Sequence, residues 1–429
     1  MKKKKSDFLK TLTMDNVSVI KISDKATADI SLSGSKSISN RLLIIRALSG
    51  TDFELENLSS SKDTVTLNTL LQQEEDVYNA GHAGTTFRFL CSYLALQKGT
   101  QILTGSSRML ERPIGPLVKA LLELGFNISY EGKEGYPPLK IGEATGEIKD
   151  SVAMDGSVSS QFLSSLLLVA PYLPHGLKLK IEGELVSRPY LQMTLNLIER
   201  FGAEYSWSDD TISVSPGSYK SMDFFVEGDW SSASYIYLCL SLQEQGEIII
   251  HGLEEQSLQG DSRMAEFAEQ FGISTSFGER KITITREKKQ LTPLVEFNLI
   301  EQPDLCQTLT VMCAANNIQG IFSGLKTLKI KETDRVAALN TELAKFNVSF
   351  SPLPKQFSAK SDDTYYMLMG KVDKHDNKIS IATYDDHRMA MAFAPLSKIT
   401  PIEIEDHMVV KKSYPDYWKD LEKLGYHLI

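Results

Sequence analysis

Five stretches of the chain share one order of polar and apolar positions. Each begins with polar or basic residues, continues with apolar residues at helical spacing, reaches one small residue and ends in a short alternating segment. The copies are RPIGPLVKALLELGFNISY, RPYLQMTLNLIERFGAEYSW, GDSRMAEFAEQFGISTSF, ETDRVAALNTELAKFNVSF and YPDYWKDLEKLGYHLI. The pattern therefore predicts the same helix–turn–strand element five times.

The small residue after each predicted helix recurs at a regular interval. These residues are Gly125, Gly202, Gly272, Asn347 and Gly425, and successive members lie 70 to 78 residues apart. Glycine and asparagine suit the position after a helix, where the backbone φ is positive. A period of this length exceeds that of solenoid repeats and accommodates a small βαβ-containing unit. We expect about six α/β units in two lobes, with a degraded sixth copy beginning at Asp63.

The chain is predicted to cross between the two lobes at two places. The segment ATADISLSGSK indicates a strand that enters a turn at Ser33, and FFVEGDWSSASY indicates a strand that ends at Gly228 before a helix. These points predict a contiguous domain, 34–229, and a discontinuous domain, 1–33 with 230–429. A length of 429 residues also favours two domains over one core.

The composition indicates a globular protein with an acidic balance, 42% hydrophobic and 24% charged with a formal net charge of -9. That balance argues against nucleic acid as a partner. No apolar run approaches the roughly 20 residues of a membrane span, and the basic start lacks the apolar core of a secretory signal. Four cysteines stand in apolar contexts without metal-ligand spacing, which predicts buried thiols and a cytoplasmic location. They are Cys91, Cys239, Cys306 and Cys313.

Basic residues recur at or near the starts of predicted helices, where the helix dipole disfavours cations. They are Lys36, Arg41, Arg88, Arg112, Lys331, Arg335, Arg388 and Lys412. Helix ends and basic side chains placed in this way predict a site for an anionic ligand. The ordinary alternative for each is a capped turn or a solvated ion pair, which remains open for each motif taken alone.

Uncharged donors and two acids complete the candidate chemistry. Ser159, Ser160 and Gln161 precede a long apolar helix, and Ser187 with Tyr190 repeats that arrangement. These donors suit a polyol or phosphate site, and plain helix capping is the open alternative. Further candidates are Ser37 beside Lys36, Gly84 in HAGTTFR, Asp304 before an apolar helix, and Glu332 among the cations of KETDR. The chain contains no GxGxxG, Walker A, HExxH or CxxC motif, which disfavours a nucleotide cofactor and a zinc mechanism.

Ten motifs in order make the chain resemble the EPSP synthase family of enolpyruvyl transferases, from about Ser31 to the C-terminus. They are GSKSISNR, AGTTFR, RPIGPL, DGSVSSQFL, LVSRPY, EGDWSSASY, QGDSRMAEFAEQFG, KETDR, DDHRMAMAF and KSYPDYW. The resemblance implies a two-domain inside-out α/β barrel in which each domain has three βαβαββ units. A shortened stretch between Asp63 and His82 predicts that one unit is truncated near 63–82.

The resemblance also implies an activity. The family transfers the enolpyruvyl group of phosphoenolpyruvate to the 5-hydroxyl of 3-phosphoshikimate and releases phosphate, in the pathway to chorismate and the aromatic amino acids. It works as a monomer on these two small molecules and needs no metal or organic cofactor.

Roles follow residue by residue from the matching motifs. Asp304 would accept the proton of the 5-hydroxyl, Glu332 would protonate the methylene carbon, and Lys36 would assist catalysis. The residues implied for 3-phosphoshikimate are Lys36, Ser37, Arg41, Ser159, Ser160, Gln161, Ser187, Tyr190, Asp304, Thr327 and Lys331. The residues implied for phosphoenolpyruvate are Lys36, Gly84, Arg112, Gln161, Arg335, Arg388 and Lys412.

Two positions depart from the family pattern, since His82 and Thr327 stand where the family usually has asparagine. Altered substrate affinities are expected from them. Two other interpretations remain. One is the sister transferase that acts on UDP-N-acetylglucosamine, which typically uses a cysteine in a mobile loop. The other is a non-catalytic anion-binding relative.

Overall fold

The computed structural model describes residues 16–21, 27–357 and 363–429, which divide into two compact units. Unit 1 comprises the described residues of 1–32 with 231–251 and 263–429, and unit 2 comprises 33–230 with 252–262. The short segment 252–262 thus belongs with unit 2, whereas the sequence grouped it with 230–429. The domain boundaries drawn from the sequence stay a prediction.

One strand order recurs in both units, in five four-stranded sheets. In each repeat, the first two strands are parallel and are joined through a helix. After a second helix, the last two strands form an antiparallel pair, and the fourth strand inserts between the second and the third. The five sheets are β4-β5-β7-β6, β8-β9-β11-β10, β2-β13-β15-β14, β16-β17-β19-β18 and β20-β21-β1-β22. This is the βαβαββ unit expected from the sequence.

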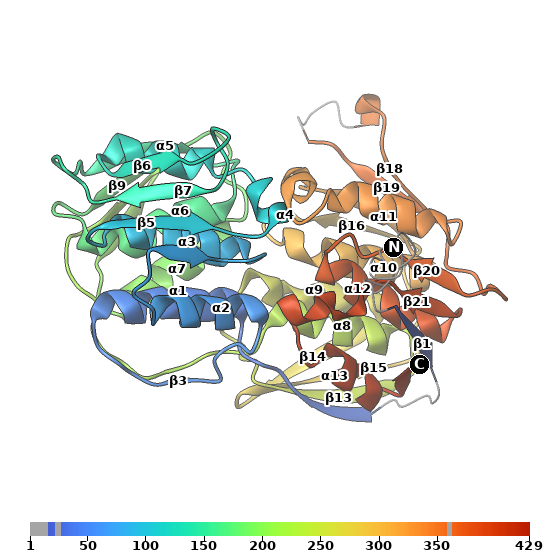
Figure 1. Ribbon diagram of the computed structural model, residues 1–429. Helices are drawn as coiled ribbons and strands as arrows, with labels where there is room; N and C mark the ends of the chain where they lie inside the picture. Colours follow the sequence, from blue (N-terminus) through green and yellow to red (C-terminus); the bar gives the residue numbers. More distant parts are fainter. Residues whose placement is uncertain (1–15, 22–26, 358–362) are drawn as a thin grey trace, which may run out of the picture. The chain divides into compact units, whose positions relative to one another are not determined.

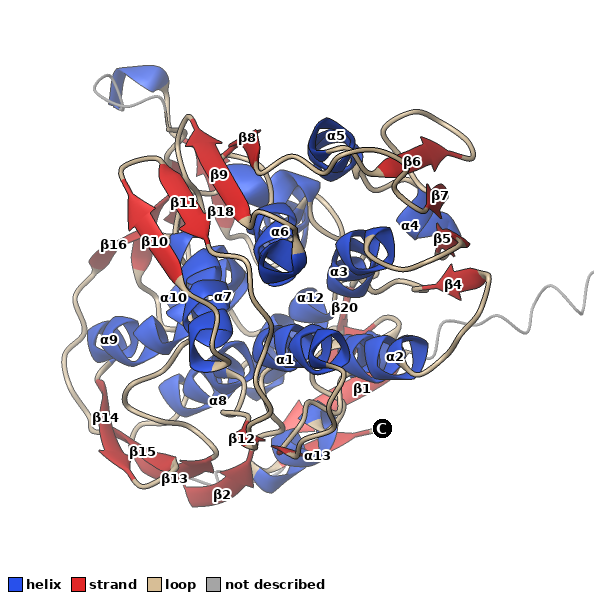
Figure 2. Cartoon of the chain, turned by 90° about the vertical axis from the view of Figure 1, so that its left-hand side faces the viewer, coloured by secondary structure: helices blue, strands red, loops and turns tan. Residues whose placement is uncertain are grey.

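Unit 2 contains two complete copies of the repeat, with their strands red and helices blue in Figure 2. The first consists of β4 (Val77–Asn79), α3 (Gly84–Ala95), β5 (Thr100–Thr104), α5 (Gly115–Leu124), β6 (Asn127–Tyr130) and β7 (Leu139–Gly142). The second consists of β8 (Ser151–Asp155), α6 (Ser160–Val169), β9 (Leu177–Glu182), α7 (Arg188–Arg200), β10 (Tyr205–Ser208) and β11 (Thr211–Val214). A short helix, α4 (Ser107–Leu110), lies between β5 and α5.

The third repeat of unit 2 is incomplete. It contains α1 (Lys36–Ser49), β3 (Leu55–Glu56) and α2 (Lys62–Leu71). Among the described strands, β3 pairs only with the short parallel strand β12 (Phe224–Phe225). After α2 the chain runs through residues 72–76 directly into β4 without a closing strand pair. The truncation predicted near 63–82 is therefore confirmed.

Unit 1 contains three copies. The first consists of β2 (Thr27–Ser31), α8 (Trp230–Ser241), β13 (Gly246–His251), α9 (Met264–Ala268), β14 (Ile273–Gly278) and β15 (Lys281–Arg286). The second consists of β16 (Leu294–Asn298), α10 (Cys306–Ala315), β17 (Gln319–Ser323), α11 (Arg335–Ala344), β18 (Ser349–Pro352) and β19 (Tyr366–Met369). The third consists of β20 (Ile379–Ile381), α12 (His387–Phe393), β21 (Ile402–Ile404), α13 (Tyr417–Lys423), β22 (Tyr426–Leu428) and β1 (Val17–Lys21).

The third sheet of unit 1 joins the two ends of the chain. In Figure 1, β1 lies beside β21 near the C-terminal label. Val17 pairs with Ile404 and Val19 with Leu428, so β1 takes the place that the last strand of the repeat holds in the other sheets. The last residues of the chain are therefore part of the fold.

Helices occupy the interior of each unit, and the sheets cover them. All residues of α12 are buried, and so are all but Tyr93 in α3. Apart from His387 and Arg388 in α12 and Arg88 in α3, the buried residues of these helices are apolar or small. Strand β9 alternates instead, with Leu177, Leu179 and Ile181 buried and the residues between them exposed. This is the inside-out arrangement that the resemblance implied.

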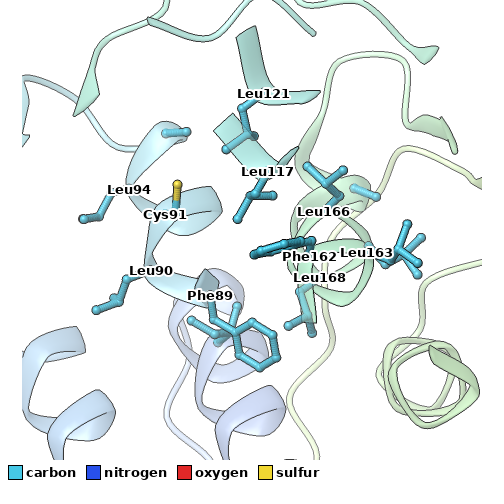
Figure 3. Packing of buried hydrophobic residues seen from close by; sticks show 14 of the residues in the cluster. Phe89, Leu90, Cys91, Leu94, Leu117, Leu121, Phe162, Leu163, Leu166 and Leu168 are labelled. Atoms are coloured by element: carbon cyan, nitrogen blue, oxygen red, sulfur yellow. The ribbon is translucent and has the colours of Figure 1, made fainter. Parts of the chain in front are cut away.

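The core of unit 2 forms where α3 and α6 meet (Figure 3). Phe162 of α6 points toward α3 (Figure 3), and Phe89 and Leu90 of α3 and Phe162, Leu163 and Leu166 of α6 are each at most 4% exposed. Burying each of these side chains stabilises the fold by about 1.5–3 kcal/mol. Since both helices carry candidate residues at their first turns, this packing also fixes where those turns lie.

The closing residues of the five predicted helices all have positive φ, from 60° at Asn347 to 103° at Gly125. The helix–turn–strand elements predicted from the hydrophobic pattern are therefore confirmed, and each positive-φ residue follows the end of its helical segment within three residues. Among the described residues, no helix combines the length and the apolar character that crossing a membrane requires.

Candidate active site

Arg335 lies at the centre of a charged cluster in unit 1. It is the first residue of α11, whose N-cap Asp334 accepts a hydrogen bond from the amide of Ala337 at 3.0 Å. The Arg335 guanidinium is 2% exposed and donates to Asp304 Oδ1 at 2.9 Å, Glu332 Oε2 at 2.9 Å and Asp386 Oδ2 at 2.7 Å. Burial alone would lower the pKa of Arg335, but the three carboxylates outweigh it and raise that pKa above its usual value.

Asp304 is bound by three cations. It lies in the 3₁₀ turn Pro303–Leu305 that leads into α10, and its carboxylate accepts from Arg335 and from Arg388 Nη2 at 2.8 Å. Lys331 Nζ lies 3.8 Å from Oδ1. Burial raises the pKa of Asp304, but the charges of Arg388, Lys331 and Arg335 together hold it well below its usual value. Asp304 is therefore ionised at neutral pH.

Arg388 is held in the first turn of α12. Asp386 caps this helix by accepting from the Arg388 amide at 2.9 Å. The Arg388 guanidinium also contacts the backbone carbonyl of Asp304 at 3.2 Å and the hydroxyl of Tyr235 at 3.3 Å. A guanidinium fixed by this many groups presents a set geometry to a carboxylate or phosphate.

The remaining predicted residues of unit 1 are Lys331, which contacts Asp304, and Thr327 and Lys412. Burial holds the pKa of Lys331 below its usual value, although the charge of Asp304 opposes that shift. Thr327 is buried in the 3₁₀ segment Lys326–Ile330, just before Lys331. Lys412 ends the 3₁₀ segment His407–Lys412 and is not joined to the cluster by any ion pair within the described part of the chain.

Sequence analysis did not identify Asp386 as a candidate site residue. The structure shows it fully buried and bound to both Arg335 and the Arg388 amide. No local signal could have revealed the contact with Arg335, because the two residues are 51 positions apart.

In unit 2, Arg41 is a buried cation surrounded by neutral acceptors. Its guanidinium donates to Thr194 Oγ1 at 2.7 Å, Ser164 Oγ at 3.0 Å and the carbonyl oxygens of Ser37 and Tyr190 at 2.8 and 3.1 Å. Within the described chain no carboxylate pairs with it. Burial lowers its pKa to about 10, so it still carries its charge at neutral pH. A buried positive charge without a counter-ion favours binding of an anion.

Lys36 begins α1, next to the N-cap Ser35, and Ser37 follows it. The Lys36 ammonium lies 3.7 Å from Asp63 Oδ2, and its amide donates to Asp229 Oδ2 at 3.3 Å. Asp63, at the start of the shortened stretch, is therefore the partner of Lys36. The fold brings Lys36, Ser37 and Arg41 onto the first turns of one helix.

The first turns of α6 and α7 carry the predicted uncharged donors. Ser159 caps α6 by accepting from the Gln161 amide at 3.4 Å, and Ser160 is the first residue of that helix. Ser187 precedes α7 with a left-handed φ of 56°, and the Tyr190 hydroxyl donates to Asp261 at 3.4 Å. These groups lie at helix N-termini, where backbone amides remain available to an anion.

Two guanidiniums flank Gly84 at the start of α3. A Cβ at Gly84 would lie 2.5 Å from Arg112 Nη1 and 2.6 Å from Arg88 Nη1, so both groups lie against the bare backbone. The N-cap Ala83 provides no side-chain cap. Arg88 also donates to Gln161 Oε1 at 2.9 Å, which links α3 to α6. The sequence pointed to Arg88 only as a flanking charge, and the structure adds it to this cluster.

No group of three or more His, Cys, Asp or Glu side chains in the described residues is arranged to hold a metal ion. The four cysteines are buried, as predicted, and burial raises the pKa of Cys91, Cys239 and Cys306 to about 12. Their thiols are therefore protonated at neutral pH.

His82 Nδ1 lies 3.0 Å from Ser106 Oγ, in the loop before α3.

Comparison with known proteins gives consistent matches. The family model for EPSP synthase (3-phosphoshikimate 1-carboxyvinyltransferase) matches residues 66–421. The chain is 44% identical to the 3-phosphoshikimate 1-carboxyvinyltransferase of Bacteroides fragilis strain YCH46, over 93% of this chain and 95% of that protein. It is 36% identical to the enzyme of the same name from Vibrio atlanticus, over 94% of this chain and 97% of that protein.

Solved structures show the same fold. A structure of EPSP synthase from Acinetobacter baumannii matches with a TM-score of 0.76 at 18% identity, over 96% of this chain and 99% of that one. A second structure of that enzyme matches with a TM-score of 0.75. The two-domain α/β fold expected from the sequence is thus confirmed.

Proposed function

This chain belongs to the EPSP synthase (3-phosphoshikimate 1-carboxyvinyltransferase) family, and from that membership we propose its reaction. It transfers the enolpyruvyl group of phosphoenolpyruvate to the 5-hydroxyl of 3-phosphoshikimate. The products are 5-enolpyruvylshikimate 3-phosphate and inorganic phosphate. The reaction serves the pathway to chorismate and the aromatic amino acids, and we propose that the enzyme works in the cytoplasm as a monomer.

The observation that carries this proposal is the binding of Asp304 by Arg335, Arg388 and Lys331. A carboxylate with such a low pKa is a weak base while these cations surround it. An anionic substrate that engages the two guanidiniums would offset their charge and raise the pKa of Asp304. The arrangement suits a base that becomes effective only when an anion is bound.

The acid–base steps follow from the two carboxylates. Asp304 removes the proton of the 5-hydroxyl as that oxygen forms a bond to C2 of phosphoenolpyruvate. Glu332, 2.9 Å from Arg335, delivers a proton from its acid form to C3, which becomes a methyl group. In the elimination, Glu332 takes a proton back from that methyl group as the C2–O bond to phosphate breaks, and the proton on Asp304 passes to the leaving phosphate. Lys36 supplies a positive charge that stabilises the phosphate and carboxylate groups of the substrates.

We propose that 3-phosphoshikimate is bound mainly by hydroxyl and amide groups, together with a few charged side chains. Arg41 supports this assignment, since its guanidinium is buried and no carboxylate of the described residues pairs with it. The proposed set is Lys36, Ser37, Arg41, Ser159, Ser160, Gln161, Ser187, Tyr190, Asp304, Thr327 and Lys331.

Binding of phosphoenolpyruvate is proposed for the guanidiniums and a bare backbone segment. Gly84 supports this assignment, because Arg112 and Arg88 lie against it at the start of α3. The proposed set is Lys36, Gly84, Arg112, Gln161, Arg335, Arg388 and Lys412. The Arg88 contact with Gln161 makes Arg88 an additional candidate.

The sister reaction on UDP-N-acetylglucosamine is disfavoured by the state of the cysteines. That enzyme typically uses a cysteine in a mobile loop, whereas all four thiols here are buried. A non-catalytic relative is disfavoured by the retention of Asp304, Glu332, Lys36 and Lys412.

The test is phosphate release by the purified protein from phosphoenolpyruvate, with 3-phosphoshikimate or UDP-N-acetylglucosamine as the acceptor. Release that requires 3-phosphoshikimate is the expected result. Release that requires the sugar nucleotide would assign the chain to the sister reaction. Binding of 3-phosphoshikimate without release from either acceptor would make it a non-catalytic relative, with His82 and Thr327 as the first positions to change to asparagine.

A further inference from the structure

The turn between β20 and α12 has an unusual backbone. It comprises residues 382–386, and two consecutive residues in it, Tyr384 and Asp385, have left-handed φ values of 55° and 56°. Residues with a Cβ rarely adopt this conformation, and a bulky tyrosine does so at a cost. Such a backbone persists only where surrounding contacts hold it. The contacts that hold this turn are therefore expected to show its role.

Helix α11 holds the turn at two points. At its start, Arg335 Nε donates to Asp386 at 2.7 Å, at the end of the turn. About two helical turns later on the same face, Glu342 accepts from the Ala382 amide at 3.2 Å and from the Tyr384 hydroxyl at 2.7 Å. The turn is thus bound to one helix at its beginning, its middle and its end.

Glu342 carries a carboxylate that is buried and is held by several hydrogen bonds. Its side chain is 1% exposed, and a buried charge is costly unless hydrogen bonds satisfy it. Lys345 Nζ provides one more at 2.6 Å and also donates to the Ser380 carbonyl at 2.8 Å, in β20 just before the turn. The bonds of Glu342 thus go to the turn and to the lysine that also binds the strand before it.

Tyr384 acts as a donor in this arrangement. Burial, its hydrogen bond to Glu342 and the charge of that carboxylate raise its pKa to about 12. The hydroxyl is therefore protonated at neutral pH and donates to the carboxylate. Because the turn is anchored there, Asp386 reaches both Arg335 and the Arg388 amide.

We propose that Glu342 and Tyr384 are positioning residues, which fix the 382–386 turn and through it set Asp386 and Arg388 for an anionic substrate. Neither residue is among those assigned to bind substrate. The identity of that substrate, phosphoenolpyruvate, rests on the proposed function, whereas the restraint on the turn does not. A purely structural role would change stability without separating the two substrates.

Tyr384→Phe tests the proposal with little risk to the fold, because Tyr384 is 38% exposed and only the hydroxyl is removed. The KM for phosphoenolpyruvate is expected to rise roughly tenfold, as expected for loss of a hydrogen bond to a charged group, while the KM for 3-phosphoshikimate stays unchanged. Glu342→Gln keeps an acceptor for the hydroxyl and should have a smaller effect. Tyr237→Phe is the matched control, since it removes a hydroxyl that bonds Thr275 at 2.8 Å in the same unit.

Hydrogen exchange of the amides of 382–388 provides a readout that does not depend on activity. Exchange there should become faster in Tyr384→Phe and stay unchanged in Tyr237→Phe. Unchanged exchange, or faster exchange with both KM values unaltered, would overturn the positioning role. If the wild-type protein showed no transfer activity but Tyr384→Phe still loosened the turn, the proposed function would fail and the restraint on the turn would stand.

Discussion

Arg388 binds Asp304 twice with one guanidinium. Nη2 donates to the Asp304 carboxylate at 2.8 Å, and Nη1 donates to the backbone carbonyl of the same residue at 3.2 Å. The two residues are 84 positions apart, and they join the start of α12 to the turn before α10. The carboxylate proposed as the base and a cation proposed for the substrate are therefore directly coupled.

Asp304 and Glu332 are the two carboxylates proposed to transfer protons, so replacing either one should slow the reaction. Asp304→Asn and Glu332→Gln should each lower turnover roughly 10²-fold or more, because each removes a proton-transfer group. Both variants should still bind 3-phosphoshikimate, as measured by calorimetry. Turnover near the wild-type value in either variant would remove that residue from its role.

Arg388→Lys should weaken phosphoenolpyruvate binding while leaving the charge in place. A lysine cannot reproduce the planar fork, so the KM for phosphoenolpyruvate should rise roughly 10- to 100-fold. Arg263→Lys is the control, since Arg263 is an exposed arginine of the same unit, paired with Glu266 at 2.9 Å. Equal effects of the two substitutions would contradict a specific role for Arg388.

Gly84→Ala should disturb the two guanidiniums at the start of α3. The added Cβ would lie 2.5 Å from Arg112 and 2.6 Å from Arg88, so both must move. We expect the KM for phosphoenolpyruvate to rise roughly tenfold or more, with little change in the KM for 3-phosphoshikimate. Gly217→Ala in the same unit, where a Cβ meets nothing within 4 Å, should leave both constants unaltered.

The depressed pKa of Asp304 predicts how its contribution to stability depends on pH. The folded-state pKa lies below the usual 3.8, so the charged carboxylate stabilises the fold above that value. This contribution is lost as the pH falls from 3.8 through the folded-state pKa. Denaturant unfolding of the wild type and Asp304→Asn should show a gap that is constant near neutral pH and narrows in acid. A gap that widened in acid would contradict the ion pairing of Asp304.

Local features of the fold could be predicted from the sequence, whereas distant pairings could not. The hydrophobic period and the closing glycines identified five helix–strand elements, because both signals lie within one element. The pairing of β1 with β21 and β22 was not foreseen, since it joins the two ends of the chain.

The same distinction applies to the candidate site. Basic residues at helix starts gave Arg335 and Arg388, because a charge that opposes the helix dipole is visible locally. The contact between Arg335 and Asp386 and the position of Arg88 against Gly84 depend on how helices pack, which no short motif records. Packing also explains why Glu342 is buried, although in sequence it resembles a surface residue of an amphipathic helix.

The most direct test of the central claim follows isotopically labelled carbon from phosphoenolpyruvate by mass spectrometry, with 3-phosphoshikimate present and phosphate measured in parallel. The account predicts that the label appears attached to 3-phosphoshikimate and that one phosphate is released for each labelled product. Phosphate release without transfer of the label would mean hydrolysis of phosphoenolpyruvate and would contradict carboxyvinyl transfer.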